Sequence, residues 1–222
     1  MTAIQEVGVS VACLLLLQGC PQPVASVCPA GMVPLEGRGG PFCMHAYEVH
    51  IEGQLGDADQ GVDFPNGSTK VSLSARAGQE PSKGVSWYQA YAACAEAGWH
   101  LCTSAEWEDA CAGPTGRAWP TLDGAYASGR CAVSHPPQYH KVPLSPSGAF
   151  PDCRTPEGVY DLLGNLWEWT DPGQRDAEGR PVIDKRGAAH YSAEPQGCTY
   201  SSVGSHDPAF NGTIGFRCCV GR

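Results

Sequence analysis

Residues 158–170 read GVYDLLGNLWEWT, so two tryptophans flank a glutamate shortly after a Gly-Asn turn. Successive side chains of a strand point to opposite faces, which predicts that Trp167 and Trp169 share one face. Their large aromatic area favours burial in the core. Glu168 is then expected to point the other way, toward Asp161 and the Gly-Asn turn. This stretch predicts a buried strand with a carboxylate held on its far side.

The composition limits the class of protein. The chain has 222 residues, enough for one domain or a small pair with a sizeable core. Its net charge of −9 excludes the basic stripe that nucleic-acid binding needs, so no nucleic-acid partner is expected. The 28 glycines and 19 prolines, with only 17% charged residues, indicate a loop-rich globular domain.

An apolar run of eleven residues occupies positions 7–17. It is too short to span a bilayer and is typical of the centre of a signal peptide. It ends in Leu17-Gln18-Gly19-Cys20, which resembles a bacterial lipobox. We therefore expect a lipoprotein signal peptide over residues 1–19 and a lipid on Cys20.

Residues 20–27 then form a tether and residues 28–222 the domain, which places the protein in the bacterial cell envelope, lipid-anchored, periplasmic or at the cell surface. The membrane is a partner through the anchor. The segment before the apolar run contains Glu6 and no lysine or arginine, so ordinary signal-peptidase cleavage or a misplaced start codon stay open.

The cysteines agree with an oxidising compartment. Of twelve, Cys13 leaves with the signal peptide and Cys20 takes the lipid. The other ten are Cys28, Cys43, Cys94, Cys102, Cys111, Cys131, Cys153, Cys198, Cys218 and Cys219. An even number behind a secretory signal predicts up to five disulfides. Zinc is disfavoured because there is no CxxC and the spacings are irregular.

Local patterns predict few regular elements. Residues 28–52 read as a hairpin that a Cys28–Cys43 bridge would staple. Residues 53–84 contain spaced aspartates that superficially resemble an EF-hand loop, but the glycine and closing glutamate are misplaced, so a solvated loop is expected. Residues 114–156 are irregular. Strand-like runs follow at 166–169, near His190 and at 215–220.

Two helices are expected between these regions. Ser86 is a suitable N-cap for WYQAYAACAEA, which Gly98 ends. The spacing of Tyr88, Tyr91, Ala92 and Ala95 is helical. A capping box at Thr103-Ser104-Ala105-Glu106 opens the second helix, which ends at Gly113.

Three stretches in this order, 84–113 (GVSWYQAYAACAEAGWHLCTSAEWEDACAG), 158–170 and 212–219 (GTIGFRCC), resemble the sulfatase-modifying-factor family of formylglycine-generating enzymes. FCMHAYEV at 42–49 is a weaker match, so the resemblance spans nearly all of residues 28–222. It implies an α+β fold, a C-type-lectin-like variant with little regular structure that is stapled by disulfides. It also implies the pairs Cys94–Cys218 and Cys111–Cys198, which leaves Cys102–Cys219 and Cys131–Cys153.

The family's oxidase converts a sulfatase cysteine to formylglycine with O₂ and copper, which requires two nearby thiolates because soft sulfur ligands select Cu(I). They are expected after an Arg-Gly-Gly-Ser-like strand, which here corresponds to 185–198. Ser192 or a neighbour stands at the first position, and only Cys198 remains. Copper and formylglycine-generating activity are therefore not expected, and no catalytic residue is assigned.

Other metals are weighed in the same way. Relatives that are iron-dependent sulfoxide synthases take histidines from an additional helical domain, and we expect no such domain within residues 1–222. The seven histidines show no helical metal pair; His135 and His140 share a loop and could bind a metal weakly. The resemblance implies a calcium site at Asp161, Gly164, Leu166 and Glu168, with calcium as the cofactor. The alternative is that the two carboxylates satisfy buried backbone amides.

The leading hypothesis is a lipid-anchored, non-catalytic sulfatase-modifying-factor-like domain that binds protein, peptide or glycan outside the cytoplasm. One alternative is a divergent formylglycine-generating oxidoreductase, and the other is a structural scaffold of the cell envelope. The identity of the ligand is not encoded in any motif, since such folds place specificity in surface loops.

Overall fold

The computed structural model describes residues 28–52, 72–134, 142–192, 196–204 and 212–221. The predicted signal peptide, Cys20, the tether, the aspartates near residue 60, His135 and His140 lie outside the described residues. The elements in chain order are β1 (Met32–Gly37), β2 (Gly40–His45), β3 (His50–Glu52), β4 (Ser72–Ser74), α1 (Trp87–Glu96), β5 (His100–Leu101), α2 (Ser104–Ala112), β6 (Trp167–Thr170), β7 (Asp184–Gly187), β8 (Ile214–Phe216) and β9 (Cys218–Gly221). Neither described helix is long and apolar enough to cross a bilayer.

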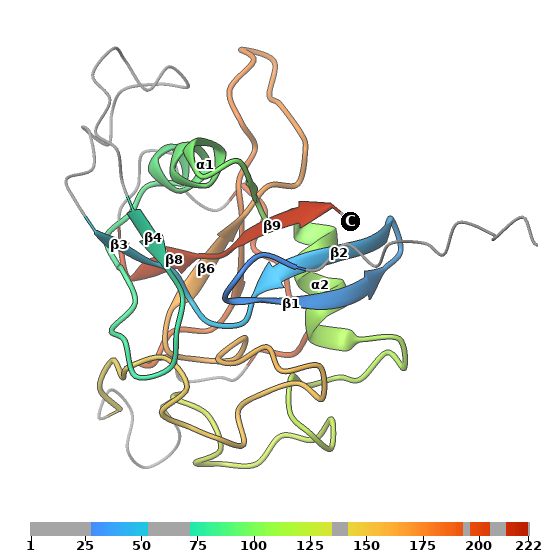
Figure 1. Ribbon diagram of the computed structural model, residues 1–222, viewed down its shortest axis with the longest axis vertical. Coiled ribbons are helices and arrows are strands. Elements are labelled where there is room, and N and C mark those ends of the chain that lie inside the picture. Colours follow the sequence, from blue (N-terminus) through green and yellow to red (C-terminus); the bar gives the residue numbers. More distant parts are fainter. Residues whose placement is uncertain (1–27, 53–71, 135–141, 193–195, 205–211, 222) are drawn as a thin grey trace, which may run out of the picture.

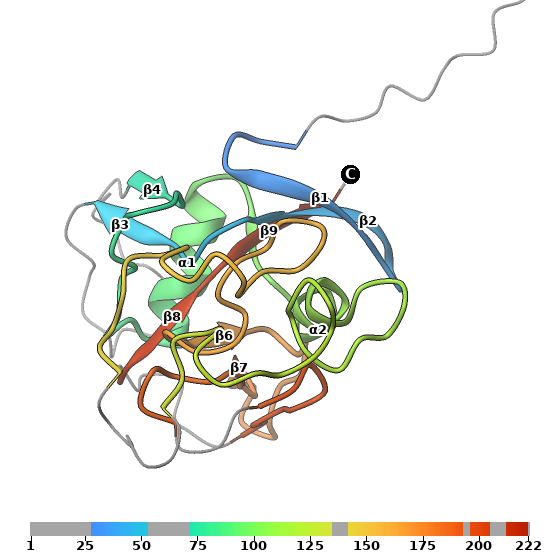
Figure 2. The same ribbon diagram turned by 90° about the horizontal axis from the view of Figure 1, so that it is seen from below.

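The β structure consists of three small sheets (Figure 1). An antiparallel sheet has the order β1-β2-β9-β5, and a second sheet has the order β7-β6-β8 with β6 parallel to β8. β3 and β4 pair separately. The described part of the connection between α2 and β6 contains no helix or strand and packs beneath the sheets (Figures 1 and 2). The low content of regular structure agrees with the expectation from glycine and proline.

The predicted hairpin is confirmed as β1 and β2, which pair in antiparallel register from Met32–His45 to Gly37–Gly40. The Cys28–Cys43 disulfide staples it. β9 adds to the other edge of β2, with Met44 opposite Cys219. The C-terminal strand therefore lies beside the start of the domain and closes it.

Helix α1 has the predicted N-cap, since Ser86 and Gln89 form a reciprocal capping box. Its buried face differs from the spacing noted in the sequence. Tyr88, Tyr91, Ala92 and Ala95 are exposed or half-buried, whereas the inward residues are Trp87, Gln89, Ala90, Ala93 and Cys94. The Cys94–Cys218 disulfide and a hydrogen bond from Trp87 Nε1 to the Thr170 carbonyl turn this other face toward the core.

Helix α2 begins at the predicted capping box, in which Thr103 and Glu106 satisfy each other's backbone amides. The glutamate carboxylate also contacts His100 Nε2 at 2.9 Å. The helix ends at Gly113, whose φ of 59° explains the glycine. Its first turn points toward the surface pocket described below.

All ten cysteines of the domain form disulfides. The pairs are Cys28–Cys43, Cys94–Cys218, Cys102–Cys219, Cys111–Cys198 and Cys131–Cys153. The first is the pair expected from the hairpin, Cys94–Cys218 and Cys111–Cys198 are the pairs that the resemblance implied, and the other two are those that remained. Three of them close loops of 87 residues or more. Such bridges each stabilise a domain by about 2–4 kcal/mol, chiefly by restricting the unfolded chain.

The tryptophan pair behaves as predicted. Trp167 and Trp169 on β6 are both buried in the core, and Glu168 between them faces α2 and contacts Trp107. The strand expected near His190 lies earlier, as β7 at Asp184–Gly187, because β7 pairs with β6 and the chain turns at residues 188–192.

Candidate functional site

The GVYDLLGNLWEWT stretch wraps tightly around buried polar groups. Gly164 has a φ of 88°, and a Cβ there would lie 2.4 Å from the Ala132 carbonyl oxygen, so only glycine fits. Asp161 and Asn165 have φ values of 58° and 59°, a conformation that aspartate and asparagine tolerate better than most residues. The tight backbone at these three positions therefore directs the side chains of Asp161 and Asn165 toward the buried polar groups.

Glu168 forms a buried ion pair with Arg217 of the GFR segment. Arg217 Nε lies 2.9 Å and 3.0 Å from its two carboxylate oxygens, and the two side chains are 0% and 1% exposed. Trp107 Nε1 donates a third hydrogen bond at 2.8 Å. Burial raises the pKa of Glu168, and Arg217 opposes that shift.

Two further carboxylates surround the same arginine. Glu48 accepts hydrogen bonds from the Leu166 amide, the Asn165 side chain and the Ser147 hydroxyl, and burial raises its pKa well above the usual range. Asp161 accepts from the Gly148 amide at 2.7 Å. Burial raises its pKa to about 6. We call Glu48, Asp161, Glu168 and Arg217 the buried carboxylate cluster.

Two of the four predicted calcium ligands, Asp161 and Glu168, belong to this cluster, and their carboxylates already have protein partners. Both oxygens of Glu168 face Arg217, so a Ca²⁺ bound there would share the carboxylate with a buried guanidinium. Asp161 already accepts the Gly148 amide. No group of three or more histidine, cysteine, aspartate or glutamate side chains in the described part of the chain could hold a metal ion. The geometry favours the alternative, in which both carboxylates satisfy buried donors, and calcium binding itself stays a prediction.

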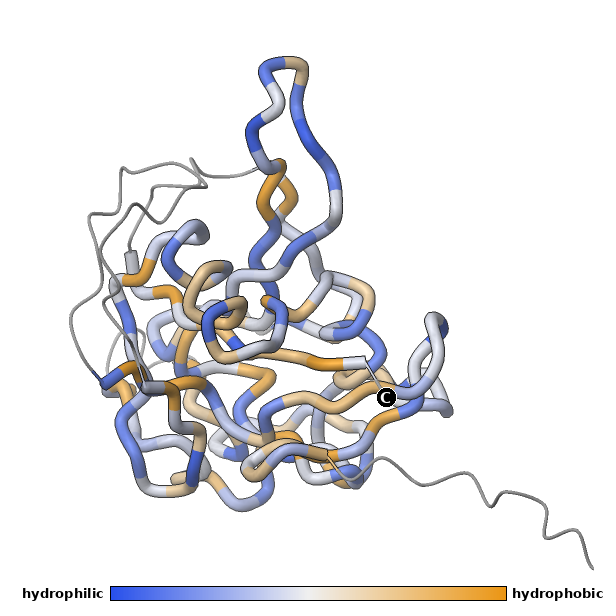
Figure 3. Tube along the Cα trace, turned by 45° about the horizontal axis from the view of Figure 1, so that its top comes forward, coloured by the Kyte–Doolittle hydropathy of each residue, from blue (hydrophilic) through white to orange (hydrophobic). Residues whose placement is uncertain are grey.

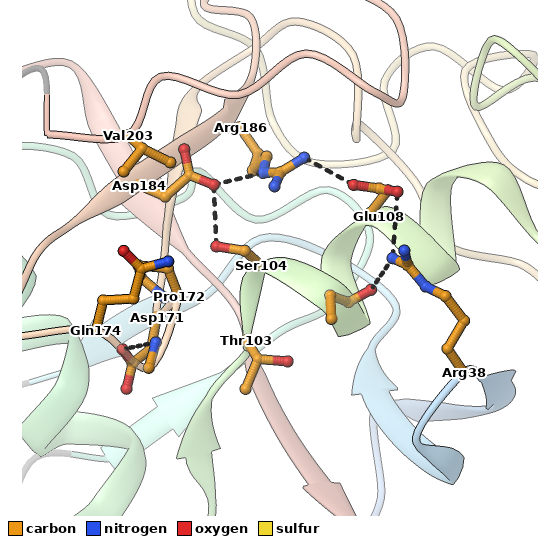
Figure 4. Close-up of a pocket in the computed structure, with 12 residues that line it drawn as sticks. Arg38, Thr103, Ser104, Glu108, Asp171, Pro172, Gln174, Asp184, Arg186 and Val203 are labelled. Atoms are coloured by element: carbon orange, nitrogen blue, oxygen red, sulfur yellow. Dashed lines mark hydrogen bonds and ion pairs between the residues drawn. The ribbon is translucent and has the colours of Figure 1, made fainter.

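A pocket of about 360 Å³ opens at the surface beside the first turn of α2 (Figure 4). We call it the polar pocket. Its lining residues come from the β1–β2 turn, α2, the segment after β6, β7 and the segment near Val203: Arg38, Thr103, Ser104, Ala105, Glu108, Asp171, Pro172, Gly173, Gln174, Asp184, Arg186 and Val203. A second hollow of about 220 Å³ shares Thr103 and Ala105 with it and continues over the β1–β2 turn.

Arg186 forms the back of the polar pocket. Its Nε donates to Asp184 at 2.6 Å, and its Nη1 contacts Glu108 at 3.3 Å and the Tyr200 carbonyl at 3.2 Å (Figure 4). Nη2 has no partner among the described residues. Since no described buried side-chain nitrogen lacks a partner, Nη2 must be accessible to solvent, although Arg186 as a whole is only 6% exposed.

Asp184 is held in place from several sides. It accepts hydrogen bonds from the Ser104 hydroxyl at 2.9 Å, the Ser201 hydroxyl and the Ser202 amide. Because Asp184 is fully buried and held by these hydrogen bonds, its ion pair with Arg186 fixes the arginine in place at the back of the pocket. The pocket therefore has a rigid polar floor.

Arg38 closes the opposite side of the polar pocket. Its guanidinium spans from Asp109, at 2.6 Å, to Glu108, at 3.2 Å. The side chain is 62% exposed, so it can move away from the mouth at little energetic cost. The exposed Arg38 thus lies opposite the buried Arg186, with Glu108 between them (Figure 4).

A hairpin-like loop begins at the side of the polar pocket formed by residues 171–174. The segment between β6 and β7 projects from the body of the molecule and is mostly hydrophilic (Figures 1 and 3). An isolated bridge joins Arg175 and Pro181 across it, and Arg180 pairs with Asp176. The root of this loop contributes residues 171–174 to the pocket, so a ligand there would also meet the loop.

The stretch that corresponds to the copper cysteines has a different structure. Cys198 is bonded to Cys111 of α2. Ser192 accepts a hydrogen bond from the Ala189 amide within a turn, and His190 Nδ1 lies 2.7 Å from the Val142 carbonyl. No free thiol is present among the described residues, because every cysteine there is paired.

The sequence did not identify the polar pocket or the partners of Glu168. Glu48, Arg186 and Arg217 all lie in stretches noted for the resemblance, but no motif indicates that these three residues approach other carboxylates. Arg38 lies in a Gly-rich turn that carries no motif. The available signal was the occurrence of charged residues within stretches expected to be buried. A buried charge needs an oppositely charged or hydrogen-bonding partner, so each of these residues predicts a partner elsewhere in the chain.

Comparisons with known proteins agree with the resemblance. The family model described as "Sulfatase-modifying factor enzyme 1-like domain" matches residues 40–221. The inactive C-alpha-formylglycine-generating enzyme 2 of Bos taurus is 33% identical over 62% of this chain and 49% of its own length. Hercynine oxygenase of Mycolicibacterium smegmatis is 34% identical over 49% of this chain and 26% of its own. The chain spans about half the length of the first curated relatives it matches.

Solved structures share the fold. The structure of CarF has a TM-score of 0.54 at 15% identity and covers 82% of this chain and 87% of its own. PvdO from Pseudomonas aeruginosa has a TM-score of 0.50 at 19% identity, with coverage of 81% and 80%. The fold is therefore the α+β, C-type-lectin-like variant of the formylglycine-generating-enzyme type. With a family match over most of its length, the chain belongs to the sulfatase-modifying-factor (formylglycine-generating-enzyme-like) domain family.

Proposed function

We propose that this chain is a non-catalytic member of its family, a binding module for a protein, peptide or glycan that is held at the bacterial cell envelope by a lipid on Cys20. The observation that carries the proposal is the Cys111–Cys198 disulfide, which occupies the sulfur expected to serve as a copper ligand.

The chemistry of copper supports this reading. A Cu(I) site of the family's kind needs two thiolates, and a disulfide sulfur is not a thiolate. Ser192 stands near the first expected position, and a neutral hydroxyl is a poor ligand for a soft metal ion. One relative carries the word "inactive" in its name, so loss of activity has a precedent in the family.

The polar pocket supports the binding role. It is concave, its floor is fixed by buried hydrogen bonds, and its walls come from five separate segments. Such preorganisation is the usual character of a ligand site. The projecting loop at its edge would extend the contact area for a larger partner.

The proposal that the chain is non-catalytic is tested by measuring copper-dependent oxidation of a sulfatase-type cysteine peptide by the full chain in the presence of O₂. We expect no formylglycine product above a copper-only control. Formation of product at a rate that saturates with peptide would support the alternative of a divergent oxidoreductase.

The binding role is tested with a variant that fills the pocket mouth. Ala105 is exposed at the start of α2 and lines both hollows, so Ala105→Trp blocks them without entering the core. Ala95→Trp is the matched control, an exposed alanine on α1 that lines neither hollow. We expect peptides or glycans of envelope extracts to be retained by the wild type and the control but not by Ala105→Trp. Equal retention by all three would contradict a role for the pocket and leave the scaffold alternative.

The anchor is tested separately. Cys20→Ala is expected to move the protein from the membrane fraction to the soluble fraction, and mass spectrometry of the wild type should find the acyl chains on residue 20. Equal distribution of both proteins would favour ordinary signal-peptidase cleavage.

A further inference from the structure

The charges around the polar pocket are already paired. Arg186 lies against Asp184 and Glu108, and Arg38 lies against Glu108 and Asp109. The remaining acid, Asp171, has Arg175 at 3.8 Å. A ligand with a net charge would have to leave water without finding an unpaired opposite charge, which is costly.

Hydrogen-bonding capacity nevertheless remains in the pocket. Arg186 Nη2 has no protein partner and offers N–H donors from a side chain that is more than nine-tenths buried. Carboxylates accept up to about four hydrogen bonds, so Glu108 and Asp171 keep free acceptor capacity. The exposed amide of Gln174 offers a donor and an acceptor. The site thus combines donors and acceptors, and each charged side chain of its lining has an oppositely charged neighbour within 4.0 Å.

An apolar surface completes the pocket. Val203 is 48% exposed, one of the few large hydrophobic side chains in the described structure left in solvent, and Pro172 lies in the same lining. A ligand that covers Val203 would remove this apolar area from water at about 25 cal/mol per Å². An ion without apolar groups would gain nothing from contact with Val203.

We infer that the polar pocket binds a neutral, polyhydroxylated ligand, a sugar unit of a glycan, through Arg186, Glu108 and Asp171, with Val203 against its C–H face. Hydroxyl groups donate and accept at once, so vicinal hydroxyls match a guanidinium N–H beside a carboxylate. A volume of about 360 Å³ lies in the range of small-ligand sites. The inference rests on the proposed binding function and names its ligand class.

The experiment uses sugars that share a ring and differ in charge. Glucose, galactose and mannose are compared with their 2-amino and uronic acid counterparts and with neutral disaccharides of each, by titration calorimetry and ligand-observed NMR on the full chain. We expect at least one neutral hexose series to bind, and its cationic and anionic counterparts to bind at least about tenfold more weakly. Absence of binding by all neutral sugars, or tighter binding of a charged counterpart, would overturn the inference.

Two blocking variants locate the site. Ala105→Trp and Val203→Trp both fill the pocket from exposed positions and are each expected to weaken sugar binding at least about tenfold, whereas Ala95→Trp keeps wild-type affinity. Each variant is used only if its melting temperature matches the wild type, and two blockers protect against the failure of one to fold. Sugar binding that neither blocker changes would overturn the assignment to this pocket.

The failure of this inference and the failure of the proposed function can be told apart. If envelope peptides bind and Ala105→Trp abolishes their binding while no neutral sugar binds, the ligand class is wrong and the binding module stands. If Ala105→Trp changes neither peptide nor sugar retention, both are overturned.

Discussion

The buried carboxylate cluster and the polar pocket use the same chemistry in opposite settings. Each places an arginine among several carboxylates, Arg217 in the first and Arg186 in the second. In the cluster both members of the ion pair are sealed from water, whereas in the pocket Glu108 is 28% exposed and Arg186 Nη2 faces solvent. Because the buried carboxylate cluster is closed to water, its ion pair can only stabilise the fold. Because the polar pocket is open to solvent, its arginine is accessible to a ligand.

The largest expected effect comes from breaking the sealed pair. Glu168→Ala leaves Arg217 buried and uncompensated and removes the acceptor of Trp107, so we expect a loss of about 3–5 kcal/mol in the free energy of unfolding. Glu108→Ala in the pocket is the matched control and should lose about 1 kcal/mol or less, because Glu108 and Arg38 are partly solvated and Arg186 keeps Asp184 as its partner. Urea unfolding with the disulfides intact measures both. Similar losses would erase the distinction between the two regions.

The next effect concerns the disulfide that borders the pocket side of α2. The double variant Cys111→Ala with Cys198→Ala should lose about 2–5 kcal/mol, since a loop of 87 residues is no longer closed in the unfolded chain. Single variants, Cys111→Ala and Cys198→Ala, serve as controls for the free thiol that each creates. We expect none of the three to gain copper-dependent oxidation of a cysteine peptide, and a gain in Cys111→Ala would mean that Cys198 retains a copper-binding role.

A third prediction uses the excess of negative charge in the cluster. Asp161→Asn keeps an acceptor for the Gly148 amide and tolerates the φ of 58°, while it removes a charge that lies near Glu48 and Glu168. We expect the variant to be more stable than the wild type at pH 7 by about 1–3 kcal/mol.

The advantage of Asp161→Asn should depend on pH in a defined direction. The pKa of Asp161 is raised from 3.8 to about 6 in the folded state, so the folded protein binds the extra proton between these values. Its contribution to stability is therefore present at low pH and is lost as the pH rises through about 6. His45, whose pKa burial lowers to about 4, acts in the opposite sense in both proteins and cancels in their difference. The gain from Asp161→Asn should shrink from pH 7 to pH 4, and a constant gain would contradict the cause given.

The smallest expected effect is that of calcium. If Arg217 supplies the cation for Glu168, a chelator should change the melting temperature of the wild type by about 1 °C or less. Glu168→Ala should then lose the same stability with calcium as without it. A calcium-dependent rise in melting temperature that Glu168→Ala removes would restore the calcium site predicted from the sequence.

Features set by local sequence or by the family pattern were predictable. The capping boxes at Ser86 and Thr103, the hairpin of β1 and β2 and the inward tryptophans of β6 follow from short-range rules. The Cys94–Cys218 and Cys111–Cys198 pairs followed from the resemblance, and the Cys28–Cys43 pair followed from the hairpin. The inward face of α1 did not, because a disulfide and an indole hydrogen bond from distant segments outweigh its weak apolar spacing.

The two arginine sites depend on contacts between residues that are far apart in the sequence, and patterns of neighbouring residues do not predict such contacts. Glu168 and Arg217 are 49 positions apart, and Arg186 and Glu108 are 78 apart. The resemblance implied a calcium ion at Glu168, whereas the structure places the guanidinium of Arg217 there. The pocket is formed from five segments and could not be assembled without the fold.

The most direct test of the central claim is peptide mapping of the native, unreduced protein after alkylation of free thiols. We expect no alkylated cysteine in residues 28–222 and a linked peptide pair that contains Cys111 and Cys198. Two alkylated cysteines that include Cys198 would contradict it, because they would supply the thiolate pair that a copper oxidase requires.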